Sequence, residues 1–451
     1  MARFDKKKSG FHIELTDSKE SSAHGGQLLI DALCQRYGLW EKLEGIPGLD
    51  VRTRTSVGFS PRALVAQLLF CLTSGGSSLA DAERMGQDMV LMGMLGLSKG
   101  ADQSTFGEWL RGQSKQSVEA FHDLIVDFVR WALGQIKSGR AQHHGELEVF
   151  FDDTEVEVQG KYFEGARRNY DGELALSWQT LWVGPFVADA ILDGACNVGQ
   201  HLEELLASRK ELWQAKSSRF FADSGSSSST DLQQIGKAGF SHWSVSYNKW
   251  VKVPQRLAAE LPEMAWGEEE KQGDETSQYA WLRYQPEESQ TAHLLAVVRR
   301  KNADELLWRY YFVATDPNET SKPEEVFLKH RRKGAREQGF SHLLSDLDLH
   351  HPPCESLIAN QMFYAIGILA HNLLAAFKAL HLDAEQQGWR PGTLIRHLLT
   401  LPVRISRHSR YVRAWICVPA GWMSWFRLFQ EQWIPKRPWG GARIKGERSV
   451  G

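Results

Sequence analysis

Three acidic residues are the residues of this chain best suited to carry chemistry. Asp152 and Asp223 each stand at the end of a predicted strand, and Glu337 lies on a predicted helix much later in the chain. Carboxylate oxygens are the hard ligands that Mg²⁺ prefers, and because Mg²⁺ keeps several waters, two or three carboxylates suffice to hold it. Two such ions, about 3.5–4 Å apart, activate the attacking oxygen and stabilise the leaving oxygen when a phosphodiester is cut. The three carboxylates therefore predict a centre of two Mg²⁺ ions, in which Mn²⁺ is expected to substitute.

Ordinary structural roles compete with this interpretation when each acid is taken singly. An aspartate before Ser224-Gly225 is a natural turn former, and Glu337 is also a plain helical partner for Lys333, four residues earlier. Asp153 is an alternative to Asp152, because neighbouring strand residues face opposite ways. The metal interpretation is favoured because two separate strands and a later helix bring carboxylates into one domain.

The elements that must position these acids change character along the chain. Apolar residues recur at helical spacing from residue 26 to about residue 137, which predicts an all-helical N-terminal domain. From Glu146 the spacing becomes that of strands, and the residues up to Tyr247 give the order βββαβαβ, typical of a mixed α/β sheet with helices packed on it. Residues 248–316 contain a charged loop and three more strand-like runs, which predict a β-rich insertion.

The segment around the third acid has the signals of a helix start. Ser321 and Glu324 flank a proline in the pattern of an N-terminal capping box. Two glycines further on each cost about 1 kcal/mol in a helix interior, which argues against one unbroken helix. If the helix does continue, His330, Lys333 and Glu337 share one face.

The composition is that of an ordinary globular protein. Hydrophobic residues make up 42% and charged residues 24%, and the formal net charge is −2. The segment from residue 401 to residue 451 contains ten basic and two acidic residues, so it is attracted to phosphate, although a solvated basic face explains it almost as well. Scattered cysteines and the lack of a long apolar run predict reduced thiols in a cytoplasmic protein that neither enters nor crosses a membrane.

Several motifs resemble those of a known family. The motifs are Asp152-Asp153-Thr154 with Gly160 and Glu164-Gly165-Ala166, Ala222-Asp223-Ser224-Gly225, the stretch His330–Gln338, Ala359–Gln361, Ala370–Leu374, Arg404–Arg410 and Gln103–Phe106. In order and spacing they resemble the DDE transposases of bacterial insertion sequences, specifically the insertion-sequence 1380 family. The resemblance extends from about residue 22 to residue 433.

This resemblance implies roles for particular residues. Asp152, Asp223 and Glu337 correspond to the metal ligands of the family. The residues expected to contact DNA are His330, Arg331, Lys333, Trp266, Arg404, Arg407 and Arg410. Among them Lys333 would contact phosphate near the cut bond, and Trp266, beside a polar loop in the insertion, would stack on a flipped base.

The resemblance also implies the fold and its division. The expected class is α/β, in the mixed α+β sense, with a ribonuclease H-like catalytic core interrupted by a β-rich insertion. The expected parts are a helical DNA-binding domain over residues 1–140, the core over 146–248 and 319–380, the insertion over 249–318, and a helical, basic C-terminal region over 381–451.

The function implied is cut-and-paste transposition. The enzyme would cleave double-stranded DNA at terminal inverted repeats and join the freed ends to target DNA, as a homodimer in its DNA complex and at the bacterial nucleoid. His330 stands where the family has Tyr, Lys333 where it has Arg, and Leu344 where related enzymes often have Lys. These departures leave two alternatives open, namely a decayed or domesticated transposase that only binds DNA, and a metal-dependent nuclease without strand transfer.

Overall fold

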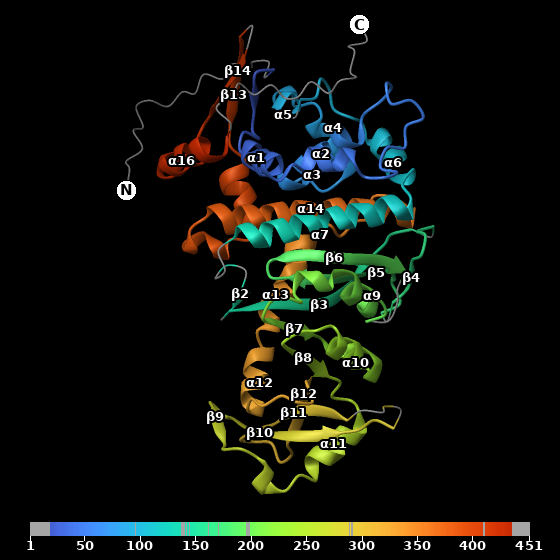
Figure 1. The fold of residues 1–451 in the computed structure, drawn as a ribbon, viewed down its shortest axis with the longest axis vertical. Helices are drawn as coiled ribbons and strands as arrows, with labels where there is room; N and C mark the ends of the chain where they lie inside the picture. Colours follow the sequence, from blue (N-terminus) through green and yellow to red (C-terminus); the bar gives the residue numbers. More distant parts are fainter. Residues whose placement is uncertain are drawn as a thin grey trace.

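The computed structural model describes residues 19–434 except 95, 137–139, 141, 144, 161, 170, 195–198, 288, 290–291 and 409–410; the side chains of 143, 335–338, 407–408 and 411–412 are also outside the description. The described chain forms an elongated molecule in which helices occupy one end and the strands are arranged in succession toward the other (Figure 1).

The N-terminal part is helical, as its apolar spacing predicts. It consists of α1 (Gln27–Tyr37), α2 (Leu39–Glu44), α3 (Pro61–Thr73), α4 (Leu79–Met85), α5 (Met89–Met94), α6 (Gln103–Arg111) and α7 (Lys115–Gln135). Side-chain caps begin several of these helices; Ser60, for example, accepts the amide N–H of Ala63 at the start of α3. Apolar faces of these helices form one core with α14 (Leu357–His381).

The central sheet confirms the βββαβαβ order. Its elements are β3 (Glu146–Glu157), β5 (Leu174–Val183), β6 (Phe186–Gly194), α9 (Leu202–Arg209), β7 (Ser218–Ala222), α10 (Ser229–Lys237) and β8 (His242–Tyr247). The spatial order is β6-β5-β3-β7-β8, with β3, β7 and β8 parallel and β5 antiparallel to its neighbours. Short strands β2 (Gln142–His143) and β4 (Arg167–Arg168) pair at its margins. A 3₁₀ turn over Lys210–Leu212 follows α9 directly.

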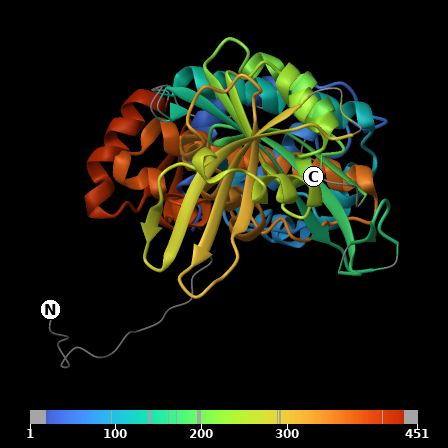
Figure 2. The same cartoon turned by 90° about the horizontal axis from the view of Figure 1, so that it is seen from below.

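The insertion continues this sheet. Strand β12 (Arg309–Thr315) pairs with β8, and β11 (His293–Asn302), β10 (Glu275–Tyr284) and β9 (Glu270–Gln272) follow outward in antiparallel order. Helix α11 (Lys252–Ala259) packs against β10. Seen from below, the strands fan out around the long axis, which is the accumulated twist expected of so many paired strands (Figure 2).

Helix α14 covers the open edge of β6. Its Asn372 accepts the amide N–H of Val187 at 2.9 Å and donates to the carbonyl oxygen of the same residue at 2.8 Å, as a neighbouring strand would. Gln361 donates to the carbonyl of Leu192 at 2.8 Å. Among the described helices α14 is the one long and apolar enough to cross a membrane, but 89% of its most apolar window is buried inside the protein. It therefore serves as the core helix that protects a sheet edge.

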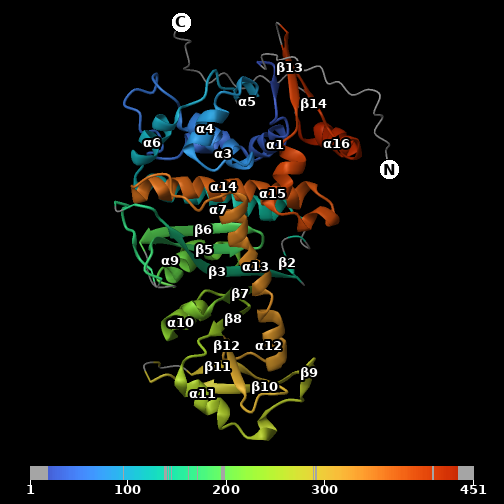
Figure 3. The same cartoon turned by 180° about the vertical axis from the view of Figure 1, so that it is seen from behind.

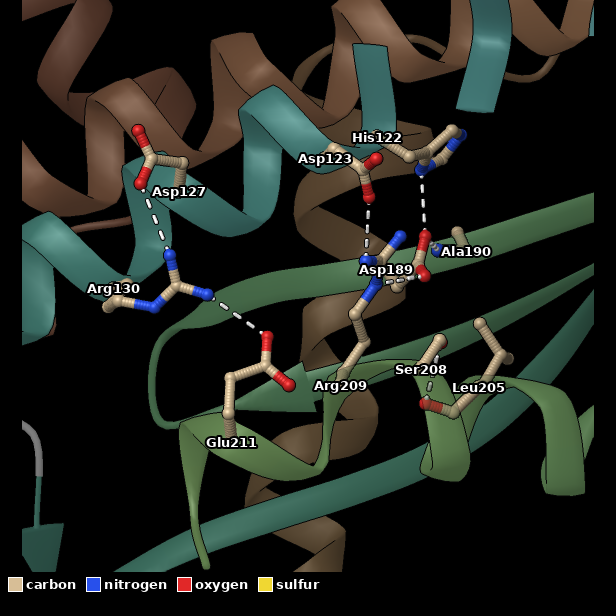
Figure 4. Close-up of polar contacts among 10 residues, drawn as sticks. All are labelled: His122, Asp123, Asp127, Arg130, Asp189, Ala190, Leu205, Ser208, Arg209 and Glu211. Atoms are coloured by element: carbon tan, nitrogen blue, oxygen red, sulfur yellow. Dashed lines mark hydrogen bonds and ion pairs between the residues drawn. The ribbon is translucent and has the colours of Figure 1, made fainter. Parts of the chain in front are cut away.

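Helix α7 is held against the sheet by charged groups. His122 Nδ1 lies 2.8 Å from Asp189 Oδ1 on β6, and the guanidinium of Arg209 on α9 donates to Asp189 at 2.6 Å and to Asp123 at 2.8 Å (Figure 4). Asp189 is buried, so the two partners compensate the cost of burying its charge. This network joins the helical part to the sheet.

Two helices, rather than one, lead to the third acid. Helix α12 (Pro323–His330) and helix α13 (Lys333–Ser341) are separated by a turn at residues 331–332, and a π-helical turn over His342–Asp346 follows (Figure 3). The predicted capping box is wrong, because the residue before the helix is Lys322 without a side-chain cap. Ser321 instead donates its amide N–H to Glu319 at 2.9 Å.

The C-terminal part returns to the helical end. Beyond α14, α15 (Pro391–Leu394) and a second π-helical turn (Ile395–Leu399) lead into β13 (Val403–His408), β14 (Tyr411–Ile416) and α16 (Met423–Trp433). With β1 (Ser21–Ser22) the two strands form a separate sheet, so the C-terminal region is not helical throughout, as it was expected to be. Val403 and Ile405 pack on α5, which leaves Arg404 on the exposed face.

Replacing Asn372 tests the edge-covering role of α14. Asn372→Ala removes both hydrogen bonds to the buried backbone of Val187 and is expected to lower the free energy of unfolding by about 2–4 kcal/mol. Urea denaturation measures the loss, and Asn318→Ala, at an exposed position, is the control with an expected change within about 0.5 kcal/mol. Equal stability of the two variants would contradict this role.

Candidate functional site

The pairing of β3 with β7 determines where the two aspartates lie. Phe150 is in register with Phe221, and the strands are parallel, so two residues further on Asp152 comes opposite Asp223. The adjoining rings of Phe150 and Phe221 stack at 5.0 Å beneath this position. The parallel register of the two strands therefore brings together two acids that are 71 positions apart in the sequence, although β3 continues beyond Asp152 to Glu157.

Lys333, on the helix that also carries Glu337, contacts Asp223. It is the first residue of α13 and is buried, with its Nζ 2.7 Å from Asp223 Oδ2. Burial alone would raise the pKa of Asp223, but the hydrogen bond and charge of Lys333 hold that pKa below its ordinary value. Asp223 is therefore ionised at neutral pH, with the lysine as its counterion.

The pKa of Asp152 is shifted in the opposite direction from that of Asp223. Burial raises its pKa to about 6; Lys333 opposes the shift and the charge of Asp223 adds to it. The pKa of Asp153 is also raised to about 6 by burial and by neighbouring carboxylates, including Asp223. A group of acids whose ionisation is disfavoured in this way is stabilised by an added cation, so the donor set fits a divalent metal.

Glu337 lies on α13, but its side chain is outside the described residues. The helix packs closely on the sheet: a Cβ at Gly339 would lie 3.0 Å from the ring of Trp182, and Phe340 contacts the same tryptophan edge-on. α13 also packs against β3, the strand of Asp152. Among the described side chains, no cluster of three or more His, Cys, Asp or Glu residues is arranged to hold a metal. The backbone thus brings the glutamate helix across the strands that carry the aspartates.

Arg390 holds the far end of the glutamate helix. Its guanidinium donates to Asp346 at 3.0 and 3.2 Å and to the hydroxyl of Ser341 at 2.6 Å. These two acceptors flank the π-helical turn that follows α13. Sequence reasoning missed this residue, because no local pattern links Arg390 to a helix more than forty residues earlier.

His330 is not placed to contact DNA, which corrects the expectation from the resemblance. Its ring is buried, with Nδ1 2.9 Å from the hydroxyl of Ser244 and Nε2 2.8 Å from that of Ser246, both on β8. Burial and the nearby charge of Lys333 lower the pKa of His330 to about 4, so the ring is neutral. The turn after His330 also ends α12, so His330 and Lys333 do not share one continuous helix face.

Trp266 is likewise in the interior rather than at a DNA-binding surface. It is 7% exposed, and the guanidinium of Arg299 lies 4.4 Å from the centroid of its ring. Arg299 also lies 4.5 Å from the ring of Trp308 and is ion-paired with Glu263. A covered ring cannot accept a base, so the expectation for Trp266 is wrong for this conformation.

A different tryptophan of the insertion is accessible. Trp250 is 79% exposed and follows the end of β8, which is parallel to β7 and ends at the same edge as the aspartates. Lys249 Nζ lies 5.1 Å from its ring centroid. A tryptophan next to a lysine directly after a strand is the local signal that could have identified it.

The remaining predicted DNA contacts are basic residues of two regions. Arg331 is exposed at the turn between α12 and α13, and Arg404 is exposed on β13. Arg407 lies on β13 with its side chain outside the described residues, and Arg410 is outside them altogether. Arg331 thus lies two residues before Lys333 in the chain, whereas β13, the strand of Arg404, lies at the helical end of the molecule (Figure 1).

Two aspartates on adjacent parallel strands, Asp152 within β3 and Asp223 directly after β7, thus lie beside a lysine that begins α13. Residues 12–432 match the family described as transposase DDE domain group 1. The chain therefore belongs to this family of transposases, whose members take part in DNA transposition and recombination as part of mobile elements. No curated protein shows a significant match.

Replacing each aspartate by asparagine is expected to change stability in opposite directions when divalent metal is absent. The folded-state pKa of Asp152 is about 6 against an ordinary 3.8, so its charge destabilises the fold above about pH 6 and costs nothing below about pH 4. Asp152→Asn is expected to be more stable than the wild type by about 1–3 kcal/mol at about pH 7, with the gain vanishing at about pH 4.

Asp223→Asn is the matched comparison. Because the pKa of Asp223 is lowered by Lys333, its charge contributes stability at neutral pH that is lost on acidification, so this variant is expected to be less stable at about pH 7. Urea denaturation in chelator at both pH values measures the differences. A loss of stability in both variants would contradict the electrostatics described for the pair.

Proposed function

We propose that this transposase cuts and joins DNA with two divalent metal ions held by Asp152, Asp223 and Glu337. The observation that carries the proposal is the register of β3 and β7, which brings the two aspartates side by side at one sheet edge. The packing of α13 on β3 supports Glu337 as the third ligand. When bound, Mg²⁺, or Mn²⁺ in its place, would activate the attacking oxygen and stabilise the leaving oxygen.

The residues around the metal ligands have separate tasks in this proposal. Lys333 contacts the phosphate at the cut bond, where its positive charge stabilises the additional negative charge of the transition state. Arg390 positions the helix of Glu337 through Asp346 and Ser341. His330 fastens α12 to β8 through two serine hydroxyls, so the change from a tyrosine alters packing rather than DNA contact.

The catalytic core is proposed to be ribonuclease H-like and to belong to the insertion-sequence 1380 type. The strand order β6-β5-β3-β7-β8, with the second of the three consecutive strands antiparallel, supports this proposal. So does the insertion between β8 and α12, at the position where the resemblance has its β-rich segment.

The reaction we propose is cut-and-paste transposition. A dimer binds the terminal inverted repeats in the bacterial cytoplasm, water cuts the strand at each end, and the freed 3′-hydroxyl attacks target DNA. The N-terminal helices and the basic residues of the C-terminal strands, Arg404, Arg407 and Arg410, hold the duplex mainly through phosphate, which positions the DNA without reading its sequence. Arg331 contacts phosphate nearer the cut.

A decayed transposase that only binds DNA is the competing function. The changed residues around Glu337 motivate it, but the ion pair between Lys333 and Asp223 supports an intact site, since the lysine occupies the place of the expected arginine and keeps its charge. DNA carrying the ends of the element separates these functions: binding without nicking indicates the decayed protein, and nicking without joined products indicates a plain nuclease.

Replacing the three acids tests the proposed site. We expect the rate of nicking in Mg²⁺ to fall by roughly a thousandfold or more in each of three variants: Asp152→Asn, Asp223→Asn and Glu337→Gln. Each variant lacks one carboxylate ligand of the metal ions that would stabilise the transition state. DNA affinity should fall little, as measured by gel shift. Asp153→Asn, one residue away on β3, is the control and should retain most activity. Full activity in any of the three variants would exclude that residue.

We further propose that Trp250, rather than Trp266, stacks on an unpaired base near the cut. Its 79% exposure and its place after β8 support this role. Trp250→Ala is expected to weaken binding of DNA with unpaired bases at the cut by about 5–100-fold, since stacking contributes about 1–3 kcal/mol per base, and to change binding of a fully paired duplex much less. Trp250→Phe should recover part of the affinity. An equal loss for both DNAs would contradict stacking.

A further inference from the structure

The buried ammonium of Lys333 occupies the space beside the aspartates that a cation would use. We propose that Lys333 is the counterion of Asp152 and Asp223 in the metal-free protein, and that DNA must draw it away before metal binds fully. Metal loading is then coupled to DNA binding. This inference rests on the proposed function, because it concerns the same metal site.

The geometry supports the first part of the proposal. Lys333 Nζ lies 2.7 Å from Asp223 Oδ2, and the lysine is 6% exposed, whereas the side chain of Asp223 is 51% exposed and open to an incoming ligand. The register of β3 and β7 sets Asp152 beside Asp223. The same ammonium is ion-paired with Asp223 and also acts on Asp152 electrostatically.

Other charged groups of the turn are engaged differently. Arg332 approaches Glu148 on β3, with 3.9 Å between the charged atoms. His330 is held between Ser244 and Ser246 as a neutral ring. Arg331 is exposed. Among the described residues 330–333, the role of counterion to the aspartates therefore belongs to Lys333.

Competition follows from the charges. A divalent ion bound by Asp223 would stand close to the ammonium and repel it, so metal and ammonium compete for the same carboxylate. The long, flexible lysine stem can carry its point charge to another acceptor, and a DNA phosphate is such an acceptor. DNA therefore removes the competitor. By linkage, DNA raises metal affinity and metal raises DNA affinity by the same factor.

Such coupling has a consequence for the protein in the cell. Before DNA arrives, the charge of the aspartates is partly compensated by a group that cannot activate water. The metal centre becomes complete only when a phosphate occupies the site, which restricts cutting to bound DNA. The lysine thereby serves both as an internal counterion and as the phosphate contact.

Mn²⁺ binding tests the proposal without measuring catalysis. Electron paramagnetic resonance of free Mn²⁺ gives the affinity of the full-length wild type, of Lys333→Met and of Lys329→Met, which removes the same charge from α12. Without DNA, Lys333→Met is expected to bind Mn²⁺ roughly tenfold more tightly than the wild type, within the range of coupling between sites. Lys329→Met should resemble the wild type.

The second measurement adds a short duplex from the end of the element. It is expected to raise the Mn²⁺ affinity of the wild type by a similar factor and to change that of Lys333→Met little. Lys333→Gln repeats both measurements with a polar side chain, and thermal unfolding verifies that each variant is folded. The proposal would be overturned if the wild type and both Lys333 variants bound Mn²⁺ with equal affinity, or if the duplex left the Mn²⁺ affinity of the wild type unchanged.

Aspartate variants distinguish this failure from failure of the proposed function. Asp152→Asn and Asp223→Asn are expected to lose most Mn²⁺ binding. If they bind Mn²⁺ as the wild type does, the metal site itself is misassigned, whatever Lys333 does. If they lose binding while Lys333 has no influence, the metal site stands and only the counterion role is wrong.

Discussion

The mutual repulsion of two carboxylates held at one sheet edge is the constraint on which the site depends. Parallel pairing of β3 and β7 up to Phe150 and Phe221 brings Asp152 and Asp223, two residues further on, into proximity. The buried ammonium of Lys333 relieves part of this repulsion. The pair is unequal: burial, with a smaller contribution from the charge of Asp223, raises the pKa of Asp152, whereas Lys333 holds the pKa of Asp223 below its ordinary value. Such a pair favours the binding of a divalent cation, because a cation binds most strongly where negative charge is least compensated.

The rest of the fold maintains this edge. Helix α14 satisfies the backbone of β6 through Asn372 and Gln361, so the sheet has no open border on that side. The insertion continues the sheet beyond β8 and thereby fixes Trp250 at the edge that carries the aspartates. The turn at residues 331–332 divides the glutamate segment into two helices. The first helix, α12, packs on the insertion and on β8. The second helix, α13, begins with Lys333 and brings it to Asp223.

Local patterns predicted most of the elements and fewer of the contacts. The βββαβαβ order expected between Glu146 and Tyr247 is confirmed. The capping box predicted at Ser321 does not form. In that motif Glu324 would accept the amide N–H of Ser321, but Glu319 accepts it instead. The expectations for His330 and Trp266 failed for a common reason: a polar or aromatic residue near a functional motif is read as exposed, whereas Ser244, Ser246 and Arg299 supply buried partners from distant strands. Those partners are separated from the motif by many residues, so no local pattern contains them.

The sequence by itself determined the period of most elements and the family, because these depend on residue type and on spacing along the chain. The prediction that Asp152 ends a strand is wrong, since β3 continues to Glu157. Tertiary structure decided which acids meet, since only the register of β3 and β7 brings Asp152 and Asp223 together. It also decided that Lys333 faces Asp223 while His330 faces β8. The physical reason is that charge interactions depend on distance and burial in space, and both are set by strand pairing and helix packing between segments far apart in the chain.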